Sequence, residues 1–168
     1  MDEHRIGLKP IRRRVWSPRG ERPIVPVHQR YQWLYVYGFV RPTTGQTMWL
    51  LMPTVSVEAW SVALAEFART VGLGPSKRID LVVDCAGWHT SPRVERPTGL
   101  QLLFLPPYSP ELQPAEHLWA LSDRPLLNRC FETLDALEAV QADHCRWLEH
   151  QTAIVRSTTN FHWWPQLA

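Results

Sequence analysis

The sequence has few cysteines, no long apolar run and no internal repeat, and each of these absences narrows its class. The three cysteines, Cys85, Cys130 and Cys145, are odd in number and match no CxxC or zinc-ribbon spacing. We therefore expect reduced thiols, as in a cytoplasmic protein, although Cys85-x3-His89 and His144-Cys145 leave a metal site open as an alternative. No stretch of about 18 apolar residues is present, which argues against a membrane-spanning helix, and the first residues form no apolar leader segment.

Charge is unevenly distributed along the 168 residues. Residues 1–30 hold eight basic and three acidic side chains, a formal charge of +5, whereas residues 31–168 carry −3. With 45% apolar and 20% charged residues the chain has an ordinary globular composition. One domain is expected, because domains typically run about 100–200 residues. A basic segment on a near-neutral body indicates either a polyanionic partner or a solvated basic loop.

Hydrophobic periodicity predicts an alternation of strands and helices. Aromatic and β-branched residues predict a β-hairpin over residues 31–52, and a further strand is expected near 24–27. An N-cap at Ser56 and an apolar stripe at steps of three and four predict a helix over 56–71. Apolar runs at 79–84 and 100–105 are typical of parallel strands buried on both faces.

The remaining segments complete the expected order of elements. A short helix is expected from Ser91, and a last helix from Thr133 to Leu148. The aromatic residues 161–165 are expected to pack back on the body or to dock a partner. This order of strands and helices predicts an α/β fold built on a mixed sheet.

Two carboxylates occupy positions where ligands are often bound. Asp84 follows an apolar strand, at the end where open α/β sheets place their ligands. Glu116 follows a proline-rich loop and falls in the first turn of a helix that Pro114 begins. Two carboxylates brought together in this way stay ionised beside a cation such as Mg²⁺. A turn-forming aspartate and a helix-start glutamate are the structural alternatives.

A resemblance to a known family rests on two segments, LVVDCAGWH at residues 81–89 and FLPPYSPELQPAEHLW at residues 104–119. Both look like DDE-type insertion-sequence transposases of the bacterial branch of the mariner superfamily. Residues 2–20 resemble the first catalytic block of that family, and residues 131–137 are similar to the opening of its C-terminal helix. The resemblance implies a ribonuclease-H-like mixed sheet flanked by helices, formed by residues 1–168 as a single catalytic domain.

The resemblance also implies a catalytic and metal site made of Asp2, Asp84 and Glu116. In the family three such acids hold two Mg²⁺ or Mn²⁺ ions, which act on DNA at transposon ends and targets. Glu3 is excluded because it faces the other side of a strand from Asp2, and Glu111 because it precedes the helix. Water would be the nucleophile for nicking, and a 3′-hydroxyl for strand transfer.

The basic start of the chain then becomes a DNA-binding surface in this interpretation. Phosphate contacts position a duplex without reading its sequence, and the side chains expected to make them are Arg12, Arg13, Arg14 and Arg19. Trp16 is expected in the core rather than stacked on a base. His89 and His117, neighbours of the acids in sequence, are interpreted as surface or core histidines, with a role in steering phosphate or water as the alternative.

Departures from the family pattern leave a second hypothesis open. The helix-turn-helix region that the family carries before its first acid is absent here, so Asp2 is expected at an end that frays. Gln113 stands where the family favours Asn, and Pro125 interrupts a helix. The chain is therefore predicted to be either an active domain or an inactive remnant that binds DNA or dimerises. The active domain would work as a homodimer or beside a separately encoded N-terminal half. A junction or RNA–DNA hybrid nuclease is a third alternative.

Overall fold

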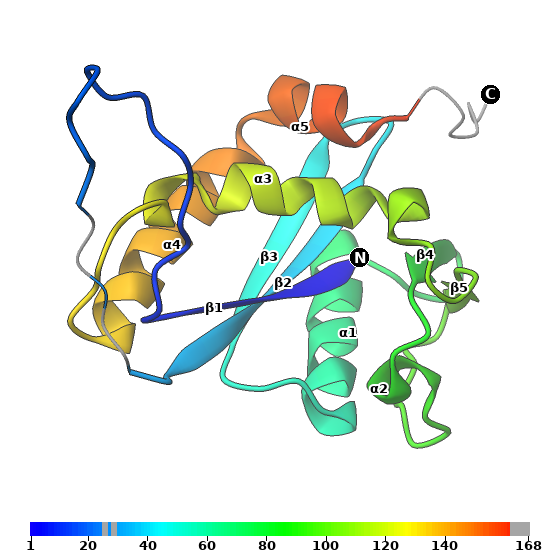
Figure 1. The fold of residues 1–168 in the computed structure, drawn as a ribbon. Helices are drawn as coiled ribbons and strands as arrows, with labels where there is room; N and C mark the ends of the chain where they lie inside the picture. The colour runs from blue at the N-terminus through cyan, green and yellow to red at the C-terminus, as the bar shows by residue number, and fades with distance from the viewer. Residues whose placement is uncertain (25–26, 28–29, 162–168) are drawn as a thin grey trace.

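Three antiparallel strands form one sheet in the computed structural model, which describes residues 1–24, 27 and 30–161 (Figure 1). β1 (Asp2–Gly7) pairs with β2 (Trp33–Arg41), and β2 pairs with β3 (Gln46–Met52). The predicted hairpin is thus confirmed. In the register of the sheet, Asp2 lies opposite Gly38.

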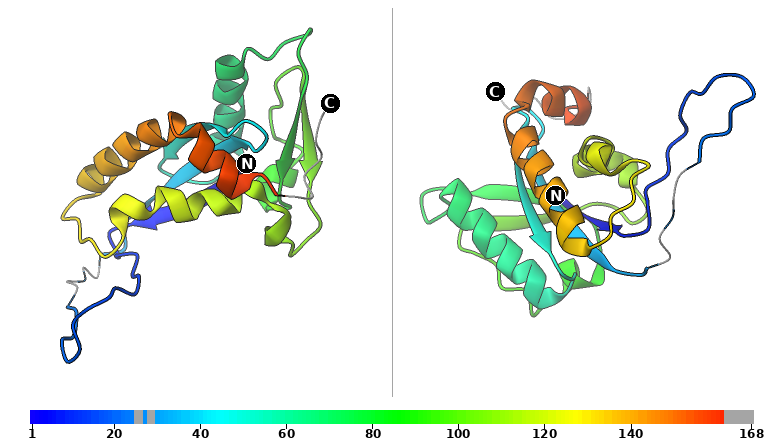
Figure 2. Two further views of the ribbon diagram at one scale, coloured as in Figure 1. Left: turned by 90° about the horizontal axis from the view of Figure 1, so that it is seen from above. Right: turned by 90° about the vertical axis from the view of Figure 1, so that its left-hand side faces the viewer.

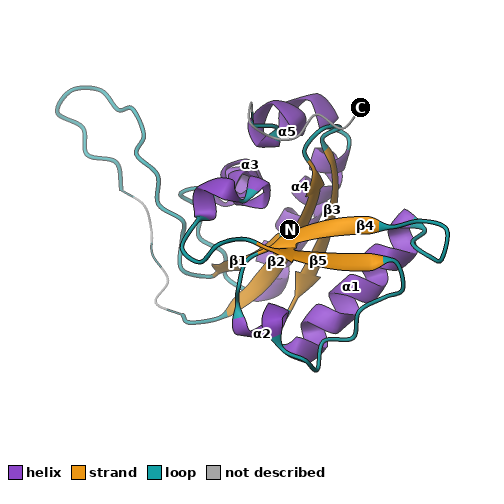
Figure 3. Ribbon diagram, turned by 90° about the vertical axis from the view of Figure 1, so that its right-hand side faces the viewer, coloured by secondary structure: helices purple, strands orange, loops and turns teal. Residues whose placement is uncertain are grey.

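A second, parallel pair of strands lies against the start of β1. β4 (Ile79–Val83) pairs with β5 (Leu100–Phe104), as the apolar runs predict. The ammonium group of Met1 donates a hydrogen bond to the carbonyl of Val82 at 2.8 Å. The carboxyl ends of β4 and β5 therefore meet the beginning of β1, as Figure 3 shows.

The two parallel strands are covered on one face, so the expectation that both faces are buried is wrong. Leu81, Val83 and Leu102 are buried in a core shared with α1, which extends over Val57–Val71. The other face carries Asp80 and Leu103, which are exposed. An apolar run alone does not distinguish a strand with one covered face from a strand with two.

Helix α1 forms where its local signals predict it. Ser56 Oγ accepts a hydrogen bond from the Ala59 amide, and Gly72 ends the helix in the left-handed region. The buried stripe of α1 packs on β2, where Phe39 stacks on Phe67 with ring centroids 4.6 Å apart. Burying side chains of this size stabilises the fold by about 2 kcal/mol each.

Short helices and two longer ones cover the opposite face of the antiparallel sheet (Figure 2). After the 3₁₀ helix η1 (Pro110–Leu112) the chain forms η2 (Pro114–Leu118), α3 (Trp119–Ser122) and η3 (Arg124–Leu126). α4 (Leu134–Glu149) begins at its predicted cap, where Thr133 Oγ1 accepts from the Ala136 amide. α5 (Thr152–Thr159) was not predicted, and no side chain caps its start.

Two local expectations need correction, and a third falls mostly outside the described residues. The short helix α2 spans Gly87–Thr90 rather than starting at Ser91, because Pro92 disfavours helical backbone in the residue before it. Ser91 accordingly has an extended ψ of 134°. Ile24 and Val27 lie in no strand and are exposed, while residues 25 and 26 of the expected strand lie outside the described residues. So do residues 162–165 of the aromatic tail, whose first residue, Phe161, contacts the ring of His117.

The segment between β1 and β2, residues 9–31, is called the arm here, and its described residues 9–24 project from the body (Figures 1 and 2). Asn128 fastens its base, since its Oδ1 accepts from the Arg13 amide and its Nδ2 donates to the Arg13 carbonyl. Trp16 is fully exposed on the arm, so its predicted place in the core is wrong. No helix among the described residues is long and apolar enough to cross a bilayer.

Candidate active site

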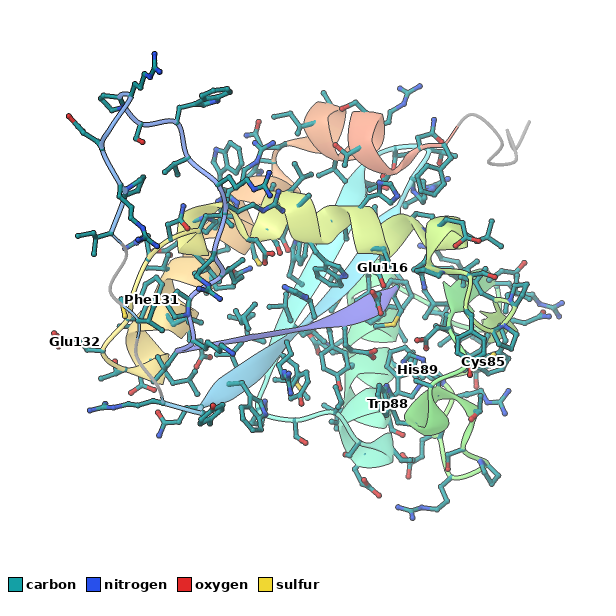
Figure 4. The ribbon with its side chains drawn as sticks, in the orientation of Figure 1. Cys85, Trp88, His89, Glu116, Phe131 and Glu132 are labelled. Carbon is teal, nitrogen blue, oxygen red and sulfur yellow. The ribbon has the colours of Figure 1, made fainter. Side chains whose placement is uncertain are left out.

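A cavity of about 520 Å³ opens where β1 begins and where β4 and β5 end. The three predicted acids, Asp2, Asp84 and Glu116, all line it, together with the loop 105–110 and Gln113. Figure 4 shows Glu116 beside the start of β1. The acids come from a strand start, a strand end and a 3₁₀ helix, so the fold brings together residues far apart in sequence. Glu3 and Glu111 are not part of the cavity wall.

Asp2 is buried and held by hydrogen bonds, so the expectation of a frayed end is wrong. Trp119 Nε1 donates to its Oδ2, and the Glu3 amide donates to its Oδ1, both at 2.9 Å. Burial raises the pKa of Asp2, and the hydrogen bond from Trp119 opposes this. Met1 is also buried, which lowers the pKa of its amino group to about 6. Its carbonyl accepts a hydrogen bond from Gln113 Nε2 at 2.8 Å.

Gly38 makes room for the tryptophan that orients Asp2. A Cβ atom on Gly38 would lie 2.9 Å from Cη2 of Trp119, closer than carbon atoms pack. The missing side chain lets the indole lie over the sheet and reach the carboxylate opposite. Trp119 also stacks on His4, with ring centroids 5.0 Å apart. Sequence reasoning missed this role of Trp119, although its place three residues after Glu116 on the same helical segment was a usable signal.

His89 links the two strands that carry the acids. Its Nδ1 lies 2.6 Å from Asp84 Oδ1, and its Nε2 lies 2.9 Å from Glu3 Oε1. Burial lowers the pKa of His89, but the hydrogen bonds to these two carboxylates outweigh it and raise the value to about 9. Both ring nitrogens then carry protons, so the contact of 3.1 Å with Trp88 Nε1 is not a hydrogen bond of the imidazolium.

The charged ring of His89 is bonded to two carboxylates, one inside the cavity and one outside it. Its hydrogen bond lowers the pKa of Asp84, which stays ionised, and the Ala86 amide adds a second bond to the same oxygen. Glu3 faces away from the cavity as predicted, but it has a structural role, because it forms an ion pair with the buried imidazolium of His89. The interpretation of His89 as a core histidine agrees with its burial, and His117 lies exposed.

The donor set of the cavity fits a hard divalent cation. Partial desolvation of its carboxyl group raises the pKa of Glu116, and the nearby carboxylates of Asp2 and Asp84 raise it further. A cation relieves this repulsion between like charges, and carboxylate oxygens are the ligands that Mg²⁺ and Mn²⁺ prefer. Gln113 adds a buried Oε1 that has no hydrogen-bond partner within the described residues.

The carboxylates are not gathered into a closed cluster. No three His, Cys, Asp or Glu side chains of the described residues stand close enough together to hold a metal ion. Asp84 and Glu116 are exposed, whereas Asp2 is fixed. An ion would therefore have to draw the two exposed carboxylates toward the buried one. The three cysteines are free thiols.

The four predicted DNA-binding arginines lie away from the cavity. Arg12, Arg13, Arg14 and Arg19 are all exposed on the arm. The arm follows the far end of β1, and a strand rises about 3.3 Å per residue. The base of the arm is therefore roughly 17 Å from Asp2 along the strand.

The chain is similar in sequence to one protein family and to one bacterial protein. A family model described as DDE superfamily endonuclease matches residues 1–138. An uncharacterized protein of Sinorhizobium fredii, y4pE/y4sA, is 39% identical over 114 residues, which cover 67% of this chain and 80% of that protein.

Solved structures of Mos1 transposase share the fold. The paired-end complex with the left transposon end has a TM-score of 0.61 at 17% identity, covering 94% of this chain and 54% of that chain. The Mos1 mariner paired end complex with Mn has a TM-score of 0.62 at 16% identity, covering 95% and 55%. The predicted ribonuclease-H-like α/β fold is confirmed, and the chain spans about half the length of these transposase chains.

Proposed function

The chain belongs to the DDE superfamily endonucleases, and on that basis we propose that it is a transposase catalytic domain that cuts DNA at transposon ends and joins it to a target. The convergence of Asp2, Asp84 and Glu116 on one cavity carries the proposal. Residues 1–168 are proposed to form this domain as a single unit. The names of the Mos1 structures, a paired-end complex and a strand transfer complex, support DNA as the partner.

Two divalent ions, Mg²⁺ or Mn²⁺, are the proposed cofactors of the three carboxylates. When bound, such ions activate the attacking oxygen and stabilise the leaving oxygen of a phosphodiester. The like-charge repulsion within the cavity supports this assignment. Mos1 structures described as complexes with Mn and with Mg support it for a protein of the same fold.

In this proposal the side chains position the metal ions and the DNA and form no covalent bond with the substrate. In nicking, a water oxygen bonds to phosphorus while the bond to the leaving DNA oxygen breaks, and in joining a 3′-hydroxyl takes the place of water. Trp119 donates to one oxygen of Asp2, and His89 bonds one oxygen of Asp84, so hydrogen bonds restrain two of the three acids before an ion would draw the three together. The exposed carboxylate of Glu116 completes the set.

The arm is the proposed DNA-binding surface. Its exposed arginines would contact phosphates on DNA that continues from the cavity along β1. A homodimer would bring two transposon ends together, and recognition of the end sequence would come from a helix-turn-helix segment or a separately encoded N-terminal half.

The test compares each acid with a matched acid outside the cavity. Asp84→Asn is paired with Asp80→Asn, an exposed aspartate on β4, the strand that Asp84 follows. Glu116→Gln is paired with Glu111→Gln in the preceding 3₁₀ helix η1, outside the cavity. Nicking of plasmid DNA with Mg²⁺ or Mn²⁺ should fall about 100-fold or more in the cavity variants and stay unchanged in their partners. Calorimetry should show metal binding lost in Asp84→Asn and kept in Asp80→Asn.

Two results would contradict the proposal. Equal nicking by Asp84→Asn and the parent would mean that another group does the chemistry. Salt-sensitive DNA binding by the parent, with neither metal binding nor cleavage, would instead support the inactive remnant.

A further inference from the structure

Tyr108 has an unusual conformation on the rim of the cavity. Its side chain is fully exposed, and its φ of 59° lies in the left-handed region. Residues other than glycine, asparagine and aspartate rarely adopt this conformation, which costs roughly 1–2 kcal/mol. The tyrosine lines the same cavity as the three carboxylates. The fold therefore holds a large aromatic ring in solvent, at a backbone position that suits a small residue.

Among the described residues, the other non-glycine residue with a left-handed backbone is Asn128, and it shows the contrast. Asn128, with a φ of 55°, uses its side chain to fasten the base of the arm through two hydrogen bonds with Arg13. Asparagine tolerates this backbone, so Asn128 has a structural explanation. The wholly exposed ring of Tyr108 packs against no core, so its presence is not explained by the stability of the fold. A strained residue without a structural purpose points to a function.

The loop that carries Tyr108 is stiff. Pro106 and Pro107 precede the tyrosine and Pro110 follows it, and proline fixes its own φ. The amide of Leu105 donates to the carbonyl of Val83 at 2.9 Å, which ties the loop to the end of β4. Binding through this ring therefore costs little ordering entropy, because the backbone is already restricted.

We propose that Tyr108 stacks on an unpaired nucleobase next to the phosphate that occupies the carboxylate cavity. This inference rests on the proposed function, because it takes DNA as the substrate. An exposed aromatic ring offers a base a flat apolar face, and such stacking tolerates any sequence. A phosphate at the carboxylates leaves its neighbouring base at the cavity rim, where Tyr108 stands. The base must leave the duplex stack first, which favours frayed or single-stranded DNA.

The test measures DNA binding by Tyr108→Asn and Tyr108→Phe in an Asp84→Asn background, so that the oligonucleotide stays intact. Tyr108→Asn should bind a single-stranded oligonucleotide about tenfold more weakly, which corresponds to about 1.4 kcal/mol. Its free energy of unfolding should stay equal or rise, since asparagine tolerates the left-handed backbone. Tyr108→Phe should bind like the parent. Trp147→Gln, at an exposed aromatic residue of α4 outside both this cavity and the arm, is the matched control and should also bind normally.

The stacked base is identified with 2-aminopurine and abasic substitutions along the oligonucleotide. Fluorescence quenching that depends on Tyr108 should appear at one position, and an abasic site there should abolish the difference in affinity between the Tyr108→Asn variant and its parent. Unchanged affinity of Tyr108→Asn overturns the inference even where nicking depends on Asp84. A tenfold effect without carboxylate-dependent nicking supports the stacking and refutes the proposed reaction. A parent that binds no DNA overturns both.

Discussion

Replacing His89 should change how the stability of the protein depends on pH. The group is buried between Asp84 and Glu3, and its pKa is raised from 6.5 to about 9. Between these two values the folded chain binds more protons than the unfolded chain, so its stability falls as pH rises. A shift of about 2.5 units corresponds to roughly 3 kcal/mol, present in full below pH 6.5 and lost above pH 9.

The buried amino group of Met1 acts in the opposite direction. Its pKa is lowered from 8.0 to about 6, so its contribution to stability rises with pH across that interval. Between pH 6.5 and 8 the contributions of His89 and Met1 to the free energy of unfolding change in opposite directions and largely cancel. The pH dependence of the parent protein alone would therefore not reveal the contribution of His89. The informative quantity is therefore the difference in free energy of unfolding between the parent and a His89 variant, in which the Met1 contribution cancels.

His89→Asn and His89→Gln remove the titrating group while keeping a donor near Asp84 or near Glu3. Urea unfolding followed by tryptophan fluorescence at pH 6, 7, 8, 9 and 9.5 gives the differences. The advantage of the parent over either variant should shrink by about 3 kcal/mol from pH 6 to pH 9.5. His150→Gln, at an exposed histidine that ends α4, is the control. A parent-to-variant difference that stays constant over this range would refute the ion-pair reasoning.

Two further predictions concern Asp2 and the arm. Trp119→Phe leaves the buried Asp2 carboxylate without its indole donor, so the free energy of unfolding at pH 7 should fall by about 1–3 kcal/mol. That deficit should shrink as pH falls and Asp2 becomes protonated, and a loss equal at all pH values would indicate lost packing alone. Replacing the four arm arginines by glutamine should reduce the slope of log K for DNA against log salt by about 3 to 4. The same change at four exposed body arginines should leave the slope nearly unchanged; these controls are Arg69, Arg93, Arg146 and Arg156.

Local signals in the sequence were enough for the elements whose ends are set by their own residues. Ser56 and Gly72 bound α1, and Thr133 starts α4, because each cap bonds to a backbone group within a few residues. The hairpin and the two parallel strands follow from β-branched and apolar runs in the same way. Family-like segments around Asp84 and Glu116 identified two of the cavity acids by residue type and spacing.

Long-range contacts decided the rest of the site. His89 meets Glu3 across 86 positions and Trp119 meets Asp2 across 117, and no periodic pattern encodes such pairs. Neither the burial of Met1 nor the gap that Gly38 leaves for Trp119 follows from local residues, because both require neighbouring strands and helices to be in place.

The tertiary structure also placed Trp16 on the surface, whereas the sequence predicted it in the core. Trp16 is a residue type typical of a core, but the arm that carries it projects from the body, and its side chain is fully exposed. The sequence by itself determined most of the order of elements and the types of residue that we propose for the chemistry. The tertiary structure decided which carboxylates share a cavity, since only the packing of β1 against β4 brings the start of one strand to the end of the other.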